Sequence, residues 1–96
     1  MPLTDDMLIV QRPHPLGGGV QRLYKLPNGY GLSLVNAPAL HSYPFAWEAA
    51  VLTDMRDDGR FSDLTYDTPL TSDVEVFSTD EEANSFIARA KAWAQS

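Results

Sequence analysis

Most of the chain has the hydrophobic spacing of β-strands, and only its C-terminal end has the spacing of a helix. Strand-type runs within residues 7–10, 20–36, 46–55 and 61–67 are bounded by Pro, Gly, Asn and Asp, which are typical of turns. Residues 78–95 instead place apolar side chains every three or four positions, as in an amphipathic helix. This pattern predicts an α+β domain, in which an antiparallel β-meander of about four strands carries a C-terminal amphipathic helix on one face.

The first predicted hairpin turns at Gly29, and the turn chemistry indicates its register. A three-residue loop, with Pro27 and Asn28 at its corners and Gly29 in a bulge, pairs Leu26 with Tyr30. A two-residue turn would shift the register by one position and mix polar and apolar side chains on both faces. The three-residue loop instead gathers the apolar side chains on one face: Tyr24, Leu26, Tyr30, Leu32 and Leu34.

The second predicted hairpin turns at Gly59. A three-residue loop that ends at Gly59 pairs Leu52 with Leu64, whereas a two-residue turn would place Asp54 directly opposite Asp63. Like charges at such a position destabilise a strand pair, so we predict a glycine bulge here as well. The aspartates of this turn lack the alternating spacing and the closing Glu of an EF-hand calcium loop, which favours a solvated turn.

The elements after the second hairpin are less uniform. Residues 74–77 are either a short edge strand or a single helical turn. The helix that follows begins with a capping box, formed either by Ser78 and Glu81 or by Thr79 and Glu82. Its predicted buried stripe is Ala83, Phe86, Ile87, Ala90, Trp93 and Ala94, and truncation of Trp93 to alanine is predicted to be severely destabilising.

Ninety-six residues fit a single small globular domain. We expect residues 1–19 to form an N-terminal strand and a Pro/Gly-rich loop, residues 20–77 the sheet, and residues 78–95 the helix. The chain has no cysteine, which excludes disulfides and thiolate metal sites. Its apolar runs are too short to span a membrane, and its acidic N-terminus has no signal-peptide core.

The net charge of −6 belongs to the second half of the chain. Residues 1–47 carry two acidic and three basic side chains, whereas residues 48–96 carry eleven acidic and four basic ones. This balance argues against nonspecific attraction to nucleic acid or to anionic lipid. The acidic half either keeps a small domain soluble or serves as a binding surface.

Candidate catalytic groups are few. The chain has two histidines, His14 and His41, and no serine lies in a nucleophile elbow. Glu48 interrupts an apolar strand, where it either points to solvent by alternation or is a buried carboxylate with a specific partner. We therefore predict no catalytic residue, no metal ligand and no cofactor, and expect the protein not to be an enzyme.

Aromatic side chains offer another route to function. Tyr43, Phe45 and Trp47 alternate, so they share one face of an extended segment and are either core or an exposed contact patch. The candidate partner-binding residues are Tyr43 and Trp47, together with Asp57 and Asp58 of the acidic second turn.

Three segments, in their order, resemble a known group of proteins. Residues 28–34 form an NGYG-type hairpin sequence, residues 47–52 a WE-x-AVL strand and residues 66–74 a YDTP-x-T-x-DV segment. Similar segments recur in this order in small phage and prophage proteins of uncharacterised function, and the resemblance covers about residues 26–87. It implies a mobile-element origin and a cytoplasmic setting in a bacterial host cell, and it implies no activity or catalytic residue.

Together these features predict a non-enzymatic, acidic accessory protein that binds a host or phage protein. We expect a monomer or small homo-oligomer with no direct nucleic-acid or membrane binding. Two alternatives remain open. The acidic half is an imitation of nucleic acid that inhibits a defence protein, or the chain is a small oligomeric structural protein associated with the virion.

Overall fold

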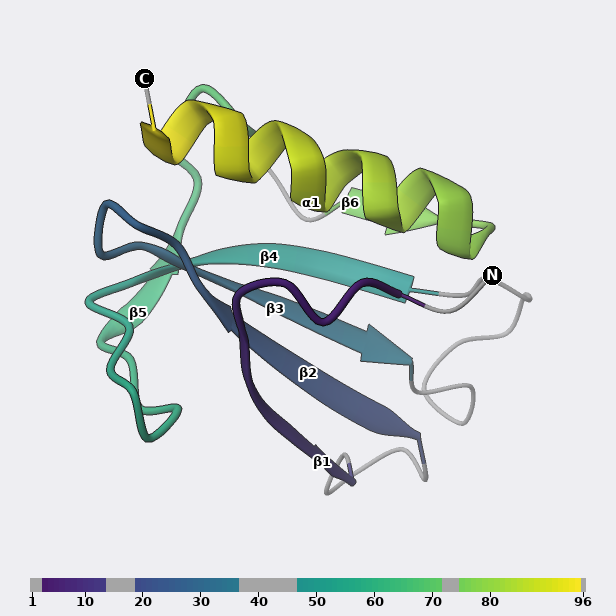
Figure 1. Cartoon of the computed structure of the whole chain (residues 1–96), viewed down its shortest axis with the longest axis horizontal. Helices are drawn as coiled ribbons and strands as arrows, with labels where there is room; N and C mark the ends of the chain where they lie inside the picture. Colours follow the sequence, from purple (N-terminus) through teal and green to yellow (C-terminus); the bar gives the residue numbers. More distant parts are fainter. Residues whose placement is uncertain (1–2, 14–18, 37–46, 72–74, 96) are drawn as a thin grey trace.

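The computed structural model describes residues 3–13, 19–36, 47–71 and 75–95, which form an antiparallel sheet with one helix against it (Figure 1). The elements are β1 (Leu8–Pro13), β2 (Val20–Lys25), β3 (Gly31–Asn36), β4 (Trp47–Thr53), β5 (Asp63–Thr65), β6 (Glu75–Phe77) and α1 (Asp80–Gln95). The predicted α+β class is confirmed. The sheet has six strands rather than about four, because both the N-terminal run and residues 75–77 pair with the rest.

Two short strands share one edge of β4. The sheet order is β1-β2-β3-β4-β5, and β6 pairs with β4 outside this path. Since β3 pairs with one edge of β4, the other edge is divided between β5, which pairs near Leu52, and β6, which pairs near Glu48. The run before the helix is therefore an edge strand and not a helical turn.

Both hairpins have the predicted register. In the first, Gly29 has a φ of +90°, its N–H donates to the Leu26 carbonyl at 3.1 Å, and the Leu26 N–H donates to the Tyr30 carbonyl at 2.8 Å. The second hairpin pairs Leu52 with Leu64, as the three-residue loop requires. The glycine bulges predicted from turn chemistry are confirmed.

Thr79 caps α1, because its Oγ1 accepts a hydrogen bond from the Glu82 N–H at 3.1 Å. Of the two candidate capping boxes, the structure therefore has the one formed by Thr79 and Glu82.

The first of two hydrophobic clusters lies between the sheet and the helix. Of the predicted stripe, Trp93 and Ala94 are only partly buried. The helix-side cluster includes Tyr24, Leu26, Leu32, Leu34, Trp47, Ala49, Val51, Phe77, Ala83, Phe86, Ile87 and Ala90.

The N-terminal segment before β1 is fastened over the same face. The Thr4 N–H donates to the Asn84 side chain of α1 at 2.9 Å, and the Tyr24 hydroxyl donates to the Thr4 carbonyl at 3.1 Å. Arg22 donates to the Tyr24 hydroxyl at 2.8 Å and also pairs with Asp5. Burial raises the pKa of the Tyr24 hydroxyl, which therefore remains a neutral donor in the folded protein. Helix and N-terminal segment together cover the helix-side face.

A second, smaller hydrophobic cluster lies on the opposite face of the sheet, which we call the open face. Leu23, Leu52 and Met55 are buried there, with Val10 and Ile9 packed against them. The β4–β5 turn folds back over this cluster, so that Gly59 is buried and a Cβ there would approach Val10 to 2.8 Å. The turn was predicted to be solvated. That prediction is confirmed for Arg56, Asp57, Asp58 and Arg60, which are exposed, and is wrong for Gly59.

Candidate interaction surface

The two aspartates predicted as binding residues are engaged within the protein. Asp57 accepts from the Lys25 ammonium of β2 at 2.7 Å, and this hydrogen bond lowers the pKa of the Asp57 carboxyl. Asp58 accepts from the Arg60 N–H at 3.0 Å and lies 3.5 Å from the Arg60 guanidinium. Both side chains are exposed, so each pair contributes little stability. Both carboxylates therefore have a basic partner, that of Asp57 on β2 and that of Asp58 within the turn itself.

The aromatic candidates form no exposed patch among the residues that the structure describes. Trp47 is 9% exposed and belongs to the helix-side cluster, and its indole N–H donates to Asp80 at 2.7 Å. Of the two alternatives for this residue, the structure therefore supports the core position. Trp47 connects the start of β4 to the start of α1 and offers little surface to a partner. Tyr43 and Phe45 lie outside the described residues.

The structure gives no support to a chemical site within the part of the chain it describes. Residues 3–13, 19–36, 47–71 and 75–95 contain no group of three or more His, Cys, Asp or Glu side chains able to hold a metal ion. Both histidines lie outside these residues. Glu48 is half-buried on the open face, with Val35 and Val76 as its strand neighbours, as alternation along β4 predicted. The described helix is too short and too polar to cross a membrane.

Two shallow clefts are lined mainly by turn and helix residues. One has a volume of about 370 Å³ and lies between the two hairpin turns, where it is lined by Asn28, Gly29, Tyr30, Thr53 and Asp54. The other, of about 420 Å³, lies between the N-terminal segment and α1, and its Asp6 and Lys91 are paired with each other at 2.5 Å. Glu48 lines neither cleft. Neither contains a histidine or a pair of carboxylates suited to acid–base catalysis.

Large apolar side chains are exposed along the divided edge of β4. Phe61 is 38% exposed, Leu64 and Tyr66 are each 43% exposed, and Val76 is 41% exposed. We call these four residues the β5–β6 surface. Scattered exposed apolar residues are normal on a protein, but neighbouring ones on a single sheet edge mark a surface suited to contact.

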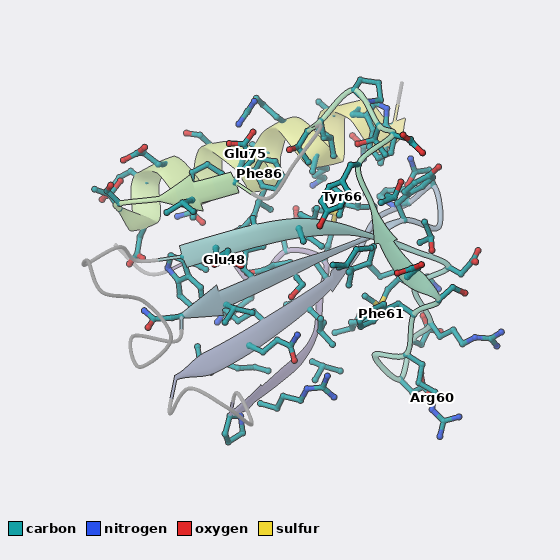
Figure 2. All side chains as sticks on the ribbon, turned by 180° about the vertical axis from the view of Figure 1, so that it is seen from behind. Glu48, Arg60, Phe61, Tyr66, Glu75 and Phe86 are labelled. Carbon is teal, nitrogen blue, oxygen red and sulfur yellow. The ribbon has the colours of Figure 1, made fainter. Side chains whose placement is uncertain are left out.

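In the row of Leu64, Tyr66 and Val76, the strand register fixes the direction of the first and the last side chain. Leu64 lies opposite Leu52, and Val76 lies opposite Glu48, so both point to the open face. Tyr66 lies one residue beyond the end of β5, on the chain that leads toward β6. Figure 2 shows Tyr66 beside β4, between Phe61 and the β6 residue Glu75. Because the β4–β5 turn covers the open face farther toward β1 and β2, the row remains outside the second cluster.

Local side chains satisfy backbone donors beside the row, and Asp63, opposite Thr53, faces the other side of the sheet from Leu64. Asp63 and Asp67, next to Leu64 and Tyr66 in the chain, are both exposed. The Asp63 carboxylate accepts from the Leu64 N–H at 2.8 Å, and the Thr65 hydroxyl accepts from the Asp67 N–H at 3.3 Å. With these donors occupied, addition of a partner strand to β5 is disfavoured. Contact through the side chains is the remaining mode.

The β5–β6 surface was not predicted from the sequence, although the predicted strand pairs contained part of the information. The predicted pairs Leu52 with Leu64 and Ala50 with Tyr66 already placed these side chains on one face. The pattern did not reveal that α1 covers the other face, nor that β6 would extend the row with Val76.

The chain matches no protein-family model, no curated protein and no solved structure. The resemblance to phage and prophage proteins therefore remains a prediction.

Proposed function

We propose that this is a non-enzymatic accessory protein of the phage or prophage type, acting in the bacterial cytoplasm, that binds a protein partner through the β5–β6 surface. The observation that supports this proposal is the row of exposed apolar side chains at Leu64, Tyr66 and Val76. Removing apolar area from water is favourable at about 25 cal/mol per Å². Tyrosine is also among the residues that most often dominate binding energy at protein interfaces. A partner that covers this row gains from both effects.

The alternative of nucleic-acid mimicry has less support. It requires an uncompensated acidic surface, whereas Asp57 and Asp58 pair with Lys25 and Arg60. The alternative of a virion-associated oligomer requires copies of the chain to associate with one another. Both alternatives are distinguishable from the proposal, because mimicry predicts a partner retained through acidic residues alone and the oligomer predicts self-association.

The test is retention of a partner from bacterial lysate by the tagged full-length chain and by the double variant Leu64→Thr, Tyr66→Thr. Threonine suits a strand, and both positions are exposed, so stability is expected to change by no more than about 0.5 kcal/mol per site. The wild type is expected to retain a discrete protein, and the double variant to retain it at least about tenfold less. Ala92→Ser, at an exposed position on α1, is the control and is expected to behave like the wild type.

Equal retention by the double variant and the wild type would exclude the β5–β6 surface as the binding site. If the wild type retains no protein in any lysate while a small metabolite copurifies, protein binding itself is wrong.

A further inference from the structure

We propose that Asn28 is a site of spontaneous deamidation, at which the first hairpin turn of the folded protein converts an asparagine into aspartate and isoaspartate. This modification site goes beyond the proposed function and does not involve the β5–β6 surface. It lies in the turn of Pro27, Asn28 and Gly29 that joins β2 to β3, beside the cleft between the two hairpin turns.

The reaction needs only groups of the chain and water. The Gly29 backbone nitrogen loses its proton to a base and attacks the Asn28 Cγ atom. The N–Cγ bond forms, the Cγ–Nδ2 bond breaks, and Nδ2 takes up a proton and leaves as ammonia, so that a cyclic imide remains. Water then opens the imide at the Cγ carbonyl, which gives aspartate, or at the main-chain carbonyl, which gives isoaspartate. The net change is amide plus water to carboxylic acid plus ammonia, with no oxidant and no cofactor.

Access to the reacting groups is the first argument. The Asn28 side chain is exposed and lines the cleft between the two hairpin turns, so water reaches its amide. The attacking nitrogen belongs to a glycine, and a Cβ on Gly29 would have no atom within 4 Å. Neither a side chain on the attacking residue nor a packed neighbour therefore hinders formation of the imide.

The second hairpin supplies an internal comparison, because Asp58 and Gly59 form the same kind of turn. In both turns the glycine N–H donates to the carbonyl three positions earlier, at 3.1 Å in the first turn and 3.0 Å in the second. Gly59, however, is buried, and a Cβ on it would approach Val10 to 2.8 Å. Asp58 presents a carboxylate paired with Arg60, which is a poorer target for a nucleophile than an amide. Of these two turns, only the first combines an amide with an open glycine.

The other asparagines of the chain lack this combination. Asn36 and Asn84 are followed by Ala37 and Ser85, whose side chains hinder attack by the backbone nitrogen. Asn84 also lies within α1, where its Oδ1 accepts from the Thr4 N–H at 2.9 Å. Asn28 is therefore the asparagine at which the chain deamidates first.

Two hydrogen bonds of the turn control the rate. The Gly29 N–H, which must lose its proton, donates to the Leu26 carbonyl. The Asn28 Oδ1 atom accepts from the Tyr30 N–H at 3.2 Å, which orients the side chain. Both bonds must open before the nitrogen reaches Cγ. Because an exposed turn opens at a lower free energy than the whole domain, the reaction proceeds from a locally opened turn in an otherwise folded protein.

The product alters both the charge and the backbone of the turn. Either acid adds a negative charge to the cleft that Asp54 also lines. Isoaspartate in addition inserts a methylene group into the main chain, which lengthens the loop that holds Leu26 opposite Tyr30. We therefore expect amide NMR shifts at the end of this hairpin and at Met55, whose N–H donates to the Gly29 carbonyl at 3.0 Å.

The test follows the full-length chain over weeks in a mildly alkaline buffer, because the attacking nitrogen must lose its proton. Peptide mapping by mass spectrometry quantifies the acid formed at each asparagine, and chromatography separates aspartate from isoaspartate. We expect Asn28 to lose its amide at least about tenfold faster than Asn36 or Asn84, which corresponds to a barrier lower by about 1.4 kcal/mol or more. Both acids are expected at position 28.

Three variants test the chemistry and the role of the turn. Asn28→Gln keeps an amide, but its extra methylene disfavours closure of the imide ring, so acid formation at this position is expected to stop on the same timescale. Asn36→Gln is the matched control and is expected to leave the rate at Asn28 unchanged. Pro27→Ala gives the opened turn more conformational freedom and is expected to accelerate the reaction about twofold to fivefold. Unfolding curves verify that each variant is folded.

Three results would overturn the inference. The first is acid formation at Asn28 no faster than at Asn36 and Asn84. The second is acid formation in Asn28→Gln at the wild-type rate, which would indicate direct hydrolysis and not an imide. The third is a rate at Asn28 that rises with urea in step with global unfolding, because the folded state would then protect the turn. The proposed function stands or fails separately, since none of these variants alters the β5–β6 surface.

Discussion

Replacement of Phe86 with alanine is expected to lower the free energy of unfolding by about 3–5 kcal/mol. Phe86 is fully buried at the centre of α1, and its ring centroid lies 5.3 Å from that of Phe77 on β6. The Arg89 guanidinium covers the same ring at 5.4 Å. Truncation leaves a cavity between the helix and the sheet that these neighbours fill only in part.

Trp93 provides the comparison, because sequence periodicity alone predicted the severe loss at that position. The side chain is only half-buried and makes an edge-to-face contact with Tyr30 at 5.1 Å between ring centroids. Trp93→Ala therefore removes less buried area, and we expect a loss of about 2 kcal/mol. Urea unfolding followed by circular dichroism measures both variants. A larger loss for Trp93→Ala than for Phe86→Ala would contradict the described core.

Gly59→Ala is expected to destabilise the protein by about 2–4 kcal/mol. Gly59 has a φ of +89°, which an L-residue with a side chain adopts at a cost. An added Cβ would also lie 2.8 Å from the Val10 Cγ2 atom and 3.4 Å from the Leu23 Cδ1 atom. The substitution therefore combines backbone strain with a clash in the second cluster.

Gly29 is a matched control for the backbone effect. Its φ of +90° is nearly the same, but a Cβ there would have nothing within 4 Å. Gly29→Ala is accordingly expected to cost only about 1 kcal/mol, and the difference between the two variants reports the packing of the β4–β5 turn. Losses of the same size in urea unfolding would show that this turn does not rest on Val10.

Local features of the fold were predictable from the sequence because short-range chemistry determines them. Pro27, Asn28 and Gly29 specify a bulged turn, and the resulting register places Tyr24 opposite Leu32, as observed. The capping pattern at Thr79 and the apolar spacing after it likewise specify the start and the buried face of α1.

Long-range arrangement accounts for what the sequence did not reveal. The β4–β5 turn looks polar by composition, yet it packs on Val10 and Leu23, which are far from it in the chain. The hydrogen bond from Trp47 to Asp80 likewise joins segments 33 positions apart. Whether the sheet face that carries Leu64 stays uncovered depends on where α1 lies. The periodicity within one strand carries no information on the position of the helix.

Site-specific photo-crosslinking in bacterial cells tests the proposed binding surface most directly. A photoreactive phenylalanine derivative is placed at position 64, at position 66 or, as the reference, at the exposed position 92 of α1. We predict a discrete adduct with another protein from positions 64 and 66 and none from position 92. Adducts of equal yield from all three positions, or adducts that contain only this chain, would contradict it.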